Sequence, residues 1–287
     1  KLVPYSEAAK KRGIKVYHLN IGQPDIASPN EALDAVKNNT LKLVEYPHSA
    51  GVISYREGLA KYYQSINIDV TPSEINITTG GSEALQIALA VTCNPDDEVI
   101  VMEPFYTNYN ALSLQNDVKL VPVSTSIETG FALPDVSEFE KYITPKTKGI
   151  ILCNPGNPTG SLYTKETIIK LGEIVKKHQL FLYSDEVYRE FCYTDEPHFS
   201  AMHLEGLEQN VILLDSVSKR YSLCGVRIGC IVSKNKEVMN GVLKFAQARL
   251  CSPAYGQIAA EGALATPPEY FKAVRDEYMK RRDVLIE

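Results

Sequence analysis

The sequence lacks an apolar run of membrane-spanning length, and it lacks any excess of positive charge. Its formal net charge is −5 and its pI is about 5.7. These values show none of the excess positive charge that binding to nucleic acid or to an anionic membrane surface requires. Hydrophobic residues make up 44% and charged residues 23% of the 287 residues, which is typical of a globular protein. We therefore expect small-molecule partners, with neither nucleic acid nor a membrane among them.

Cysteine and histidine are present, but they form no recognisable metal-binding pattern. The six cysteines include no C-x-x-C pair, and no histidine stands at an obvious ligand spacing from them. Several of the cysteines lie within apolar runs, where a free thiol behaves as a small hydrophobic side chain. Free thiols are typical of a reducing compartment. The sequence therefore predicts a cytoplasmic protein without a bound metal ion.

Short apolar segments alternate with helical patterns along most of the chain. The seven predicted strands are residues 74–79, 97–103, 118–124, 148–154, 180–185, 210–216 and 227–233. The predicted helices are residues 28–38, 51–66, 82–93, 136–143, 164–178, 236–250 and 267–287. Thr164 is the predicted N-cap of the fifth of these helices. This alternation is typical of an α/β fold with a mainly parallel, doubly wound sheet, in which ligands bind beyond the carboxyl ends of the strands.

The first candidate ligand-binding residues follow the predicted strands that end at Thr79 and Glu103. Gly81 and Ser82 open a helix whose free N–H groups could hold a phosphate, with the serine hydroxyl as a further donor. A tight turn with a serine cap is the alternative. Tyr106 could cover the face of a flat ligand, and the alternative is an aromatic side chain of the core.

A second group follows the predicted strands that end at Asn154 and Asp185. The prolines and glycines of "NPGNPTG" (residues 154–160) fix the backbone, so that Asn157 could present its amide to a ligand. The alternative is a rigid turn that does not require asparagine. Asp185 ends an apolar strand, where a carboxylate needs a partner or a functional role. Tyr188 lies close enough in sequence to share its site.

A lysine stands near the end of another apolar strand, in "DSVSKRYSLCGVRIG" (residues 215–229). Lys219 could bury its stem and reach water, which is the alternative to a functional role. An uncharged lysine amine, however, forms Schiff bases with carbonyl groups. Arg227 offers a planar fork suited to phosphate, and Ser216 and Ser218 flank the lysine turn. Together with the other two groups, these residues suit pyridoxal 5'-phosphate, which needs a lysine, an acid and phosphate donors.

The chain resembles the class I aminotransferases, which are fold-type I pyridoxal-phosphate enzymes. Three motifs carry the resemblance in family order: "NPGNPTG", "SDEVY" and "SVSKRYSLCGVRIG". The resemblance runs from "LNIGQPD" (residues 19–25) to "RRDVL" (residues 281–285). It implies a large cofactor-binding domain at residues 41–265. Residues 1–40 are expected to form an N-terminal arm and part of a smaller α/β domain, and residues 266–287 the start of the interdomain helix and C-terminal small domain.

The resemblance also implies a role for each residue around the cofactor ring. Lys219 matches the lysine that forms the Schiff base with pyridoxal phosphate. Asp185 matches the acid that pairs with the ring nitrogen, and Asn157 and Tyr188 match the residues that hydrogen-bond the ring hydroxyl. Tyr106 matches the aromatic residue that stacks on the ring. The catalytic roles are expected to fall on Lys219, Asp185 and Tyr188.

Other matched positions concern the phosphate and the substrate. The phosphate-binding positions are Gly81, Ser82, Ser216, Ser218 and Arg227. Gly22 matches a backbone position near the substrate. Tyr46 matches a tyrosine that reaches the phosphate of the neighbouring subunit, which implies a homodimer. The chain starts with Lys1 rather than Met and stops within a helix-like stretch, so it is expected to be cut at both ends. The family's arginine for the substrate α-carboxylate lies in its C-terminal domain, beyond the last residue here, so either the chain is truncated or it cannot transaminate unaided.

The predicted reaction moves an amino group from an L-amino acid to a 2-oxo acid. Acidic, aromatic and small neutral amino acids all remain open as donors. One alternative is a carbon–sulfur lyase that performs β-elimination with the same cofactor. Another is a cofactor-binding regulator without catalysis. A third is acyl transfer by Ser216, because "SVSK" fits S-x-x-K, although the S-D-N and K-T-G partners of that motif are missing.

Overall fold

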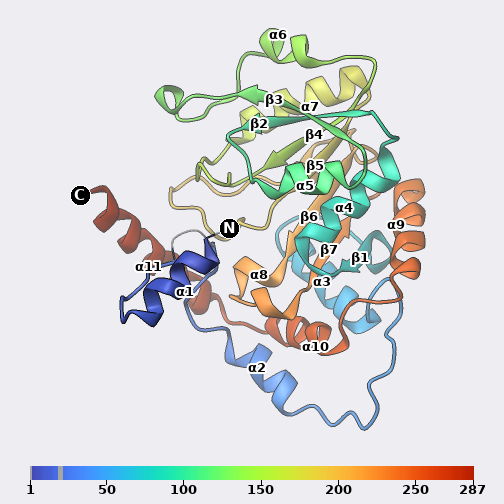
Figure 1. The fold of residues 1–287 in the computed structure, drawn as a ribbon. Coiled ribbons are helices and arrows are strands. Elements are labelled where there is room, and N and C mark those ends of the chain that lie inside the picture. Colours follow the sequence, from blue (N-terminus) through green and yellow to red (C-terminus); the bar gives the residue numbers. More distant parts are fainter. Residues whose placement is uncertain (1, 19–21) are drawn as a thin grey trace.

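The computed structural model describes residues 2–18 and 22–287 of the chain (Figure 1). Its strands form a single seven-stranded sheet with the order β1-β7-β6-β5-β4-β2-β3. The strands are β1 (Ile75–Thr78), β2 (Glu98–Glu103), β3 (Lys119–Ser124), β4 (Thr147–Cys153), β5 (Phe181–Asp185), β6 (Val211–Ser216) and β7 (Gly229–Val232). Only β7 runs against its neighbours β1 and β6, and the other pairings are parallel. The predicted α/β class, the mainly parallel sheet and all seven predicted strands are confirmed.

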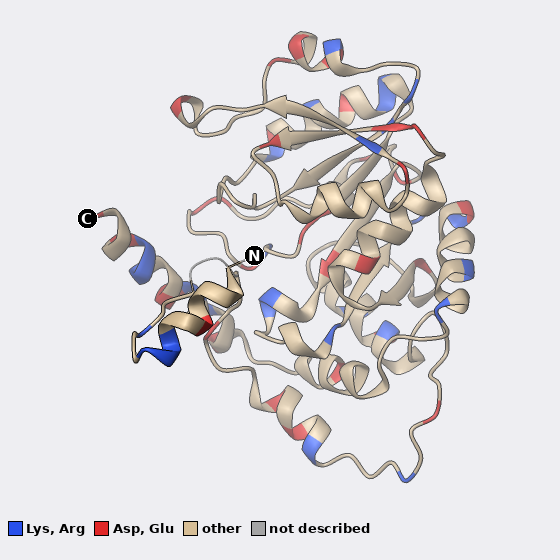
Figure 2. Ribbon diagram, in the orientation of Figure 1, with Lys and Arg blue, Asp and Glu red and all other residues tan. Residues whose placement is uncertain are grey.

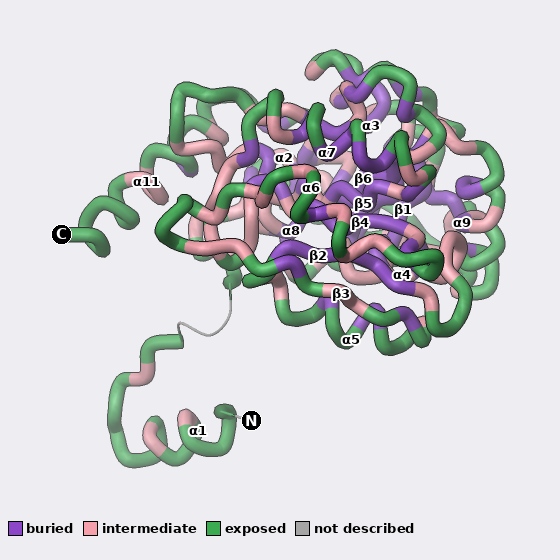
Figure 3. The backbone as a smooth tube through the Cα atoms, turned by 90° about the horizontal axis from the view of Figure 1, so that it is seen from above, coloured by how far each residue is buried: buried purple, intermediate pink, exposed green. Residues whose placement is uncertain are grey.

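Alternate residues along the central strands enter different hydrophobic clusters, so both faces of the sheet are covered. On β6, Ile212 and Leu214 pack on one face, whereas Leu213 packs on the other. The central strands can therefore be apolar at every position, which is why they appear as unbroken apolar runs in the sequence. Figure 3 shows the buried residues concentrated along the sheet. The edge strand β3 is more exposed and carries Pro122, as an edge strand can because one side of its backbone has no partner.

The helices form the two outer layers. One face is covered by α4 (Gly80–Thr92), α5 (Asn108–Leu114) and α9 (Lys236–Ala248). The other face is covered by α2 (Asn30–Lys37), α3 (Ile53–Ser65), α6 (Val136–Phe139), α7 (Lys165–His178) and α10 (Ala254–Ala263). The helix α8 (Val217–Arg220) is a single turn after β6. Figure 2 shows basic and acidic residues interspersed along outer helices such as α9.

The predicted helices are largely confirmed, and their differences from the structure have local reasons. Thr164 caps α7 as predicted, because its hydroxyl accepts a hydrogen bond from the Thr167 N–H at 3.3 Å. The helix predicted at residues 136–143 is shorter, since α6 passes into a 3₁₀ turn at Glu140–Tyr142. The helices α5, α8 and α10 were not predicted. Two of them are shorter than eight residues, which leaves too little length for a helical periodicity to appear.

The two terminal helices contribute little to the core. The helix α1 (Val3–Lys11) was not predicted, and none of its residues is buried. It stands apart from the body of the molecule in Figure 3. The long helix α11 (Pro268–Ile286) buries only Val274. In the described part of the chain, no helix combines the length and the apolar character that crossing a membrane requires.

Candidate active site

The topology of the sheet brings the predicted site residues to one edge. The strands β6, β5, β4 and β2 are consecutive neighbours in the sheet and parallel, so their carboxyl ends lie together. Because β7 is antiparallel, it is the start of β7, just after Arg227, that lies at this edge. A cleft of about 810 Å³ opens there. The predicted residues that line it are Gly22, Gly81, Ser82, Tyr106, Asn157, Asp185, Tyr188, Ser216, Ser218, Lys219 and Arg227.

The lysine is presented by the single turn α8. Ser216 caps this turn: its hydroxyl accepts a hydrogen bond from the Ser218 N–H at 3.1 Å. The Ser216 hydroxyl also lies 3.0 Å from the carbonyl oxygen of Ile228 and 2.8 Å from the Ser218 hydroxyl, to which it can donate. Lys219, half-buried, projects from the turn, and its Nζ donates to the Gly22 carbonyl oxygen at 2.6 Å. Ser216 therefore serves the turn, and among the described residues its hydroxyl makes no hydrogen bond to a histidine, lysine or carboxylate that could act as a general base for acyl transfer.

One end of the cleft is built to receive an anion. Here α4 begins, and its first backbone N–H groups have no partner within the helix. The Arg227 guanidinium lies beside this helix start, and Arg227 itself has the left-handed φ of 56°. A Cβ on Gly80 would lie 2.5 Å from an Arg227 nitrogen, so only glycine allows this approach. Gly81, Ser82 and Ser218 add donors around the same point.

The other end of the cleft carries a carboxylate. Asp185 ends β5, and its Oδ2 accepts a hydrogen bond from the Tyr109 hydroxyl at 2.6 Å. Its position deep in the molecule raises its pKa to about 6, against the lowering effect of that hydrogen bond. Beside it, the Asn157 amide donates to the Tyr188 hydroxyl at 3.2 Å, which fixes both side chains. The cleft thus has cationic groups at one end and an acid at the other.

An aromatic ring also lines the cleft. Tyr106 lines the cleft, and its hydroxyl accepts a hydrogen bond from the Asn108 amide at 2.8 Å. Its ring meets the Tyr109 ring edge-on, with centroids 5.5 Å apart. This contact and the hydrogen bond hold the Tyr106 ring in a defined orientation, as a stacking surface requires.

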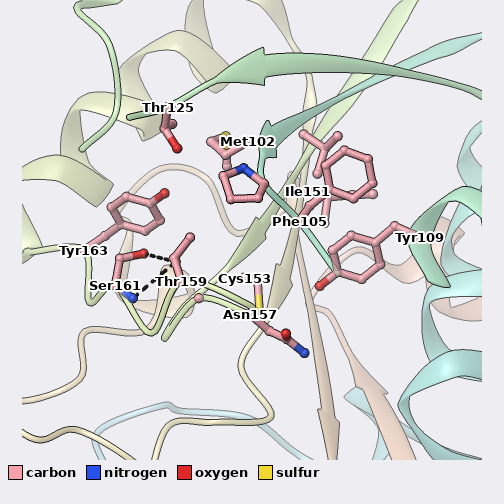
Figure 4. A pocket seen from close by; sticks show the side chains of 13 residues that line it. Met102, Phe105, Tyr109, Thr125, Ile151, Cys153, Asn157, Thr159, Ser161 and Tyr163 are labelled. Atoms are coloured by element: carbon pink, nitrogen blue, oxygen red, sulfur yellow. Dashed lines mark hydrogen bonds between the residues drawn. The ribbon is translucent and has the colours of Figure 1, made fainter. Parts of the chain in front are cut away.

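A much smaller cavity of about 20 Å³ adjoins the cleft. Figure 4 shows Cys153, Asn157 and Tyr109 along its side, with the hydroxyls of Thr159 and Ser161 hydrogen-bonded to one another. These first three residues also line the cleft, so they separate the two spaces. The small cavity has room for no more than about one water molecule. The large cleft is therefore the candidate site for an organic ligand.

Some residues of the site were not identified from the sequence. Tyr109 lies 76 positions before its partner Asp185, and the only local signal is its spacing of three from Tyr106. Asp215 is also fully buried, and it accepts hydrogen bonds from the Tyr63 hydroxyl at 2.9 Å and from Arg220 at 2.5 Å. The motif places Asp215 and Arg220 on either side of the lysine turn, but nothing local shows that they meet.

Tyr46 is the predicted residue that the structure does not bring to the cleft of its own chain. Its side chain is 79% exposed. It follows a segment in which Leu41, Leu43 and Val44 are also exposed. Tyr46 is not one of the described residues that line the cleft.

Comparisons with known proteins agree on one family. Residues 14–287 match the family model described as aminotransferase class I and II. A putative aminotransferase of Bacillus subtilis is 33% identical over 95% of this chain and 71% of its own length. An aspartate/prephenate aminotransferase of Thermus thermophilus is 30% identical over 97% of this chain and 72% of its own length. A solved structure of an aspartate aminotransferase mutant from Thermus thermophilus superposes with a TM-score of 0.92 at 28% identity, covering 99% of this chain and 75% of that one.

Proposed function

The chain belongs to the class I and II aminotransferase family and is an aminotransferase, and from this premise we propose that pyridoxal 5'-phosphate binds in the cleft, bonded to Lys219. The observation that carries the proposal is the order of groups along the cleft. Donors for an anion, a lysine amine, a carboxylate and an aromatic ring follow β1, β6, β5 and β2, in that order along the sheet, and all of them line this cleft. The substrates are an L-amino acid and a 2-oxo acid.

The cofactor fits the chemistry of these groups at each end. The Gly80 backbone leaves the space that the Arg227 guanidinium occupies beside the start of α4, and this arrangement suits a phosphate. Asp185 lines the cleft, and among the described residues no cation makes a hydrogen bond to its carboxylate; a protonated ring nitrogen would provide one. Asn157 and Tyr188 are placed to hold a ring hydroxyl between these two ends.

The residues of the cleft then divide the work of the reaction. When bound, pyridoxal 5'-phosphate supplies an aldehyde for amine exchange and a ring that accepts electrons from the substrate α-carbon. Asp185 keeps a proton on the ring nitrogen. Lys219 is placed to take and return the proton of the substrate α-carbon as general base and acid. Its contact with the Gly22 carbonyl puts the amine beside the segment proposed to lie near the substrate. A 2-oxo acid completes a ping-pong cycle.

Reductive trapping tests the covalent claim. The chain is incubated with pyridoxal 5'-phosphate, reduced with borohydride and digested, and the peptides are analysed by mass spectrometry. We expect the cofactor on Lys219 and no label at that peptide in Lys219→Ala. The exposed Lys236→Ala serves as the matched control and should be labelled like the wild type. Absence of label on Lys219 would contradict the proposal, and release of 2-oxo acid and ammonia without an acceptor would favour a lyase.

We further propose that the active form is a homodimer in which Tyr46 of each chain completes the phosphate site of the other. Its exposure and its position outside its own cleft support this assignment. A complementation experiment tests it. Chains carrying Tyr46→Ala and Lys219→Ala should each bind the cofactor poorly, but co-expression should restore one complete site per mixed dimer. Reductive labelling should then appear on Lys219 of the Tyr46→Ala chain, whereas no recovery would refute the shared site.

The division into a large domain at residues 41–265 with flanking segments at 1–40 and 266–287 also remains our proposal. It is supported by the lack of buried residues in α1 and by the single buried residue of α11. We also propose that the protein works in the cytoplasm, since each of its six cysteines is free in the structure. Limited proteolysis should cut near these boundaries and leave the large domain as a stable fragment.

A further inference from the structure

Two tyrosines at the start of α5 serve the cleft in different ways: Tyr106 precedes the helix and Tyr109 lies in its first turn. Tyr106 and Tyr109 are three residues apart, so their side chains lie on the same side of the chain. Both residues line the cleft, but the Tyr109 ring is largely covered: it lies edge-on to Tyr106 and is stacked against Phe105 at 6.3 Å. Tyr109 is only 2% exposed and belongs to the core cluster between the sheet and helices α4, α5 and α9.

A hydroxyl group at this buried position requires a partner. Phenylalanine would fill the same space without the cost of burying a polar atom. The Tyr109 hydroxyl makes a 2.6 Å hydrogen bond to Asp185 Oδ2, and its other polar neighbour is the Cys153 thiol, which is a much weaker hydrogen-bonding group. Burial raises the pKa of Tyr109 well above its usual value, so the phenol keeps its proton and remains a donor. The geometry therefore dedicates this hydroxyl to the carboxylate.

The surroundings of Asp185 make that donor important for the charge of the carboxylate. Tyr109 approaches from α5, Cys153 from β4 and Asp215 from β6, and Glu186 and Tyr188 follow in the chain. The acidic neighbours disfavour a negative charge on Asp185, as does burial. The Tyr109 hydroxyl and the Val187 N–H, at 3.4 Å from Oδ1, are the groups that favour it. The tyrosine contact is the much shorter of the two.

We propose that Tyr109 is a positioning residue for the cofactor: its hydroxyl keeps the Asp185 carboxylate ionised and aimed at the ring nitrogen. The inference rests on the proposed function, because it assigns Asp185 to that nitrogen. Tyr109 touches neither substrate nor cofactor in this role, and it acts only through the carboxylate. The segment from Tyr106 to Tyr109, at the start of α5, thus sets both the stacking ring and the orientation of the acid.

The test measures cofactor binding rather than turnover. Apo-protein is titrated with pyridoxal 5'-phosphate from about pH 5.5 to 8.5, and the absorbance of the bound cofactor reports the Kd. Tyr109→Phe removes only the hydroxyl. Its matched control is Tyr183→Phe, which removes an equally buried hydroxyl that lies 2.6 Å from the Thr92 hydroxyl, on the same strand as Asp185 but away from the cleft. Thermal unfolding checks that both variants fold.

We expect the Kd of Tyr109→Phe to rise about tenfold at pH 7, because one hydrogen bond to a charged group is lost. The rise should be larger at lower pH, since without the phenol donor Asp185 takes up its proton at a higher pH than in the wild type. Tyr183→Phe should match the wild type at every pH. A Tyr109→Phe titration that coincides with the Tyr183→Phe titration would overturn this inference alone. If the wild type binds no cofactor, the proposed function and this inference both fail.

Discussion

The Gly80 backbone and the Arg227 guanidinium lie so close that no side chain fits between them: a Cβ on Gly80 would be 2.5 Å from one arginine nitrogen. Gly80 also has a φ of +82°, which disfavours any other residue. We expect Gly80→Ala to displace Arg227 and to raise the Kd for pyridoxal 5'-phosphate about 100-fold, as loss of a charged phosphate contact should. Absorbance titration measures this change.

The control for this substitution separates backbone strain from the loss of the arginine. Gly130 has a φ of +63°, but a Cβ there would meet nothing within 4 Å. Gly130→Ala should therefore lose a similar stability, about 1 kcal/mol, without a change in cofactor affinity. An equal loss of affinity in both variants would refute the role assigned to Gly80.

A second prediction concerns the buried ion pair on either side of the lysine turn. Arg220 and Asp215 are 3% and 2% exposed. Arg220→Met leaves the carboxylate buried and unpaired, and we expect it to lower the free energy of unfolding by about 3–5 kcal/mol. The double variant Arg220→Met, Asp215→Asn should recover most of this loss, because neither side chain of the pair is then charged and the asparagine can still accept from Tyr63. Chemical denaturation measures both changes.

An exposed pair provides the comparison. Lys272 and Asp276 lie 2.7 Å apart on α11, but the lysine side chain is 71% exposed. Lys272→Met should change the free energy of unfolding by less than about 1 kcal/mol. If Arg220→Met is equally mild, the buried pair does not stabilise the turn that carries Lys219.

A third prediction is that Asp185 lowers the stability of the apo-protein but strengthens cofactor binding. The folded apo-protein raises the pKa of this group from 3.8 to about 6. The folded state therefore binds its proton more tightly than the unfolded state, and the group's contribution to stability falls as the pH rises from about 4 to 6. Because the carboxylate partly faces the cleft, we expect Asp185→Asn to stabilise the apo-protein by only about 1–2 kcal/mol above pH 6.

The same substitution should weaken cofactor binding, because an amide carries no negative charge to stabilise a protonated ring nitrogen. Thermal unfolding of the apo-proteins between pH 4 and 8 and titration with pyridoxal 5'-phosphate would show the two effects. Asp69→Asn, at an exposed position, is the control and should alter neither. A stability difference between wild type and Asp185→Asn that does not grow between pH 4 and 6 would contradict the assigned pKa.

The parts of the site that the sequence predicted all depend on local patterns. Lys219 and Asp185 stand out because a charged residue follows an apolar strand, and Asn157 because prolines and glycines surround it. The tertiary structure places these residues in one cleft because β4, β5 and β6 are parallel neighbours. Tyr109 could not be predicted in this way, because its helix is too short to show a helical periodicity of apolar residues and because its hydroxyl has a partner 76 residues away.

The sequence by itself determined the strands, most of the helices and the types of group at the strand ends, because burial on both faces and turn chemistry leave local signatures. Only the tertiary structure decided which groups meet. The order of the strands, the reversal of β7 that places Arg227 beside Gly80, and the pairing of Tyr109 with Asp185 follow from packing between distant segments. Such contacts are set by the fit of whole layers, and no short stretch of sequence contains them.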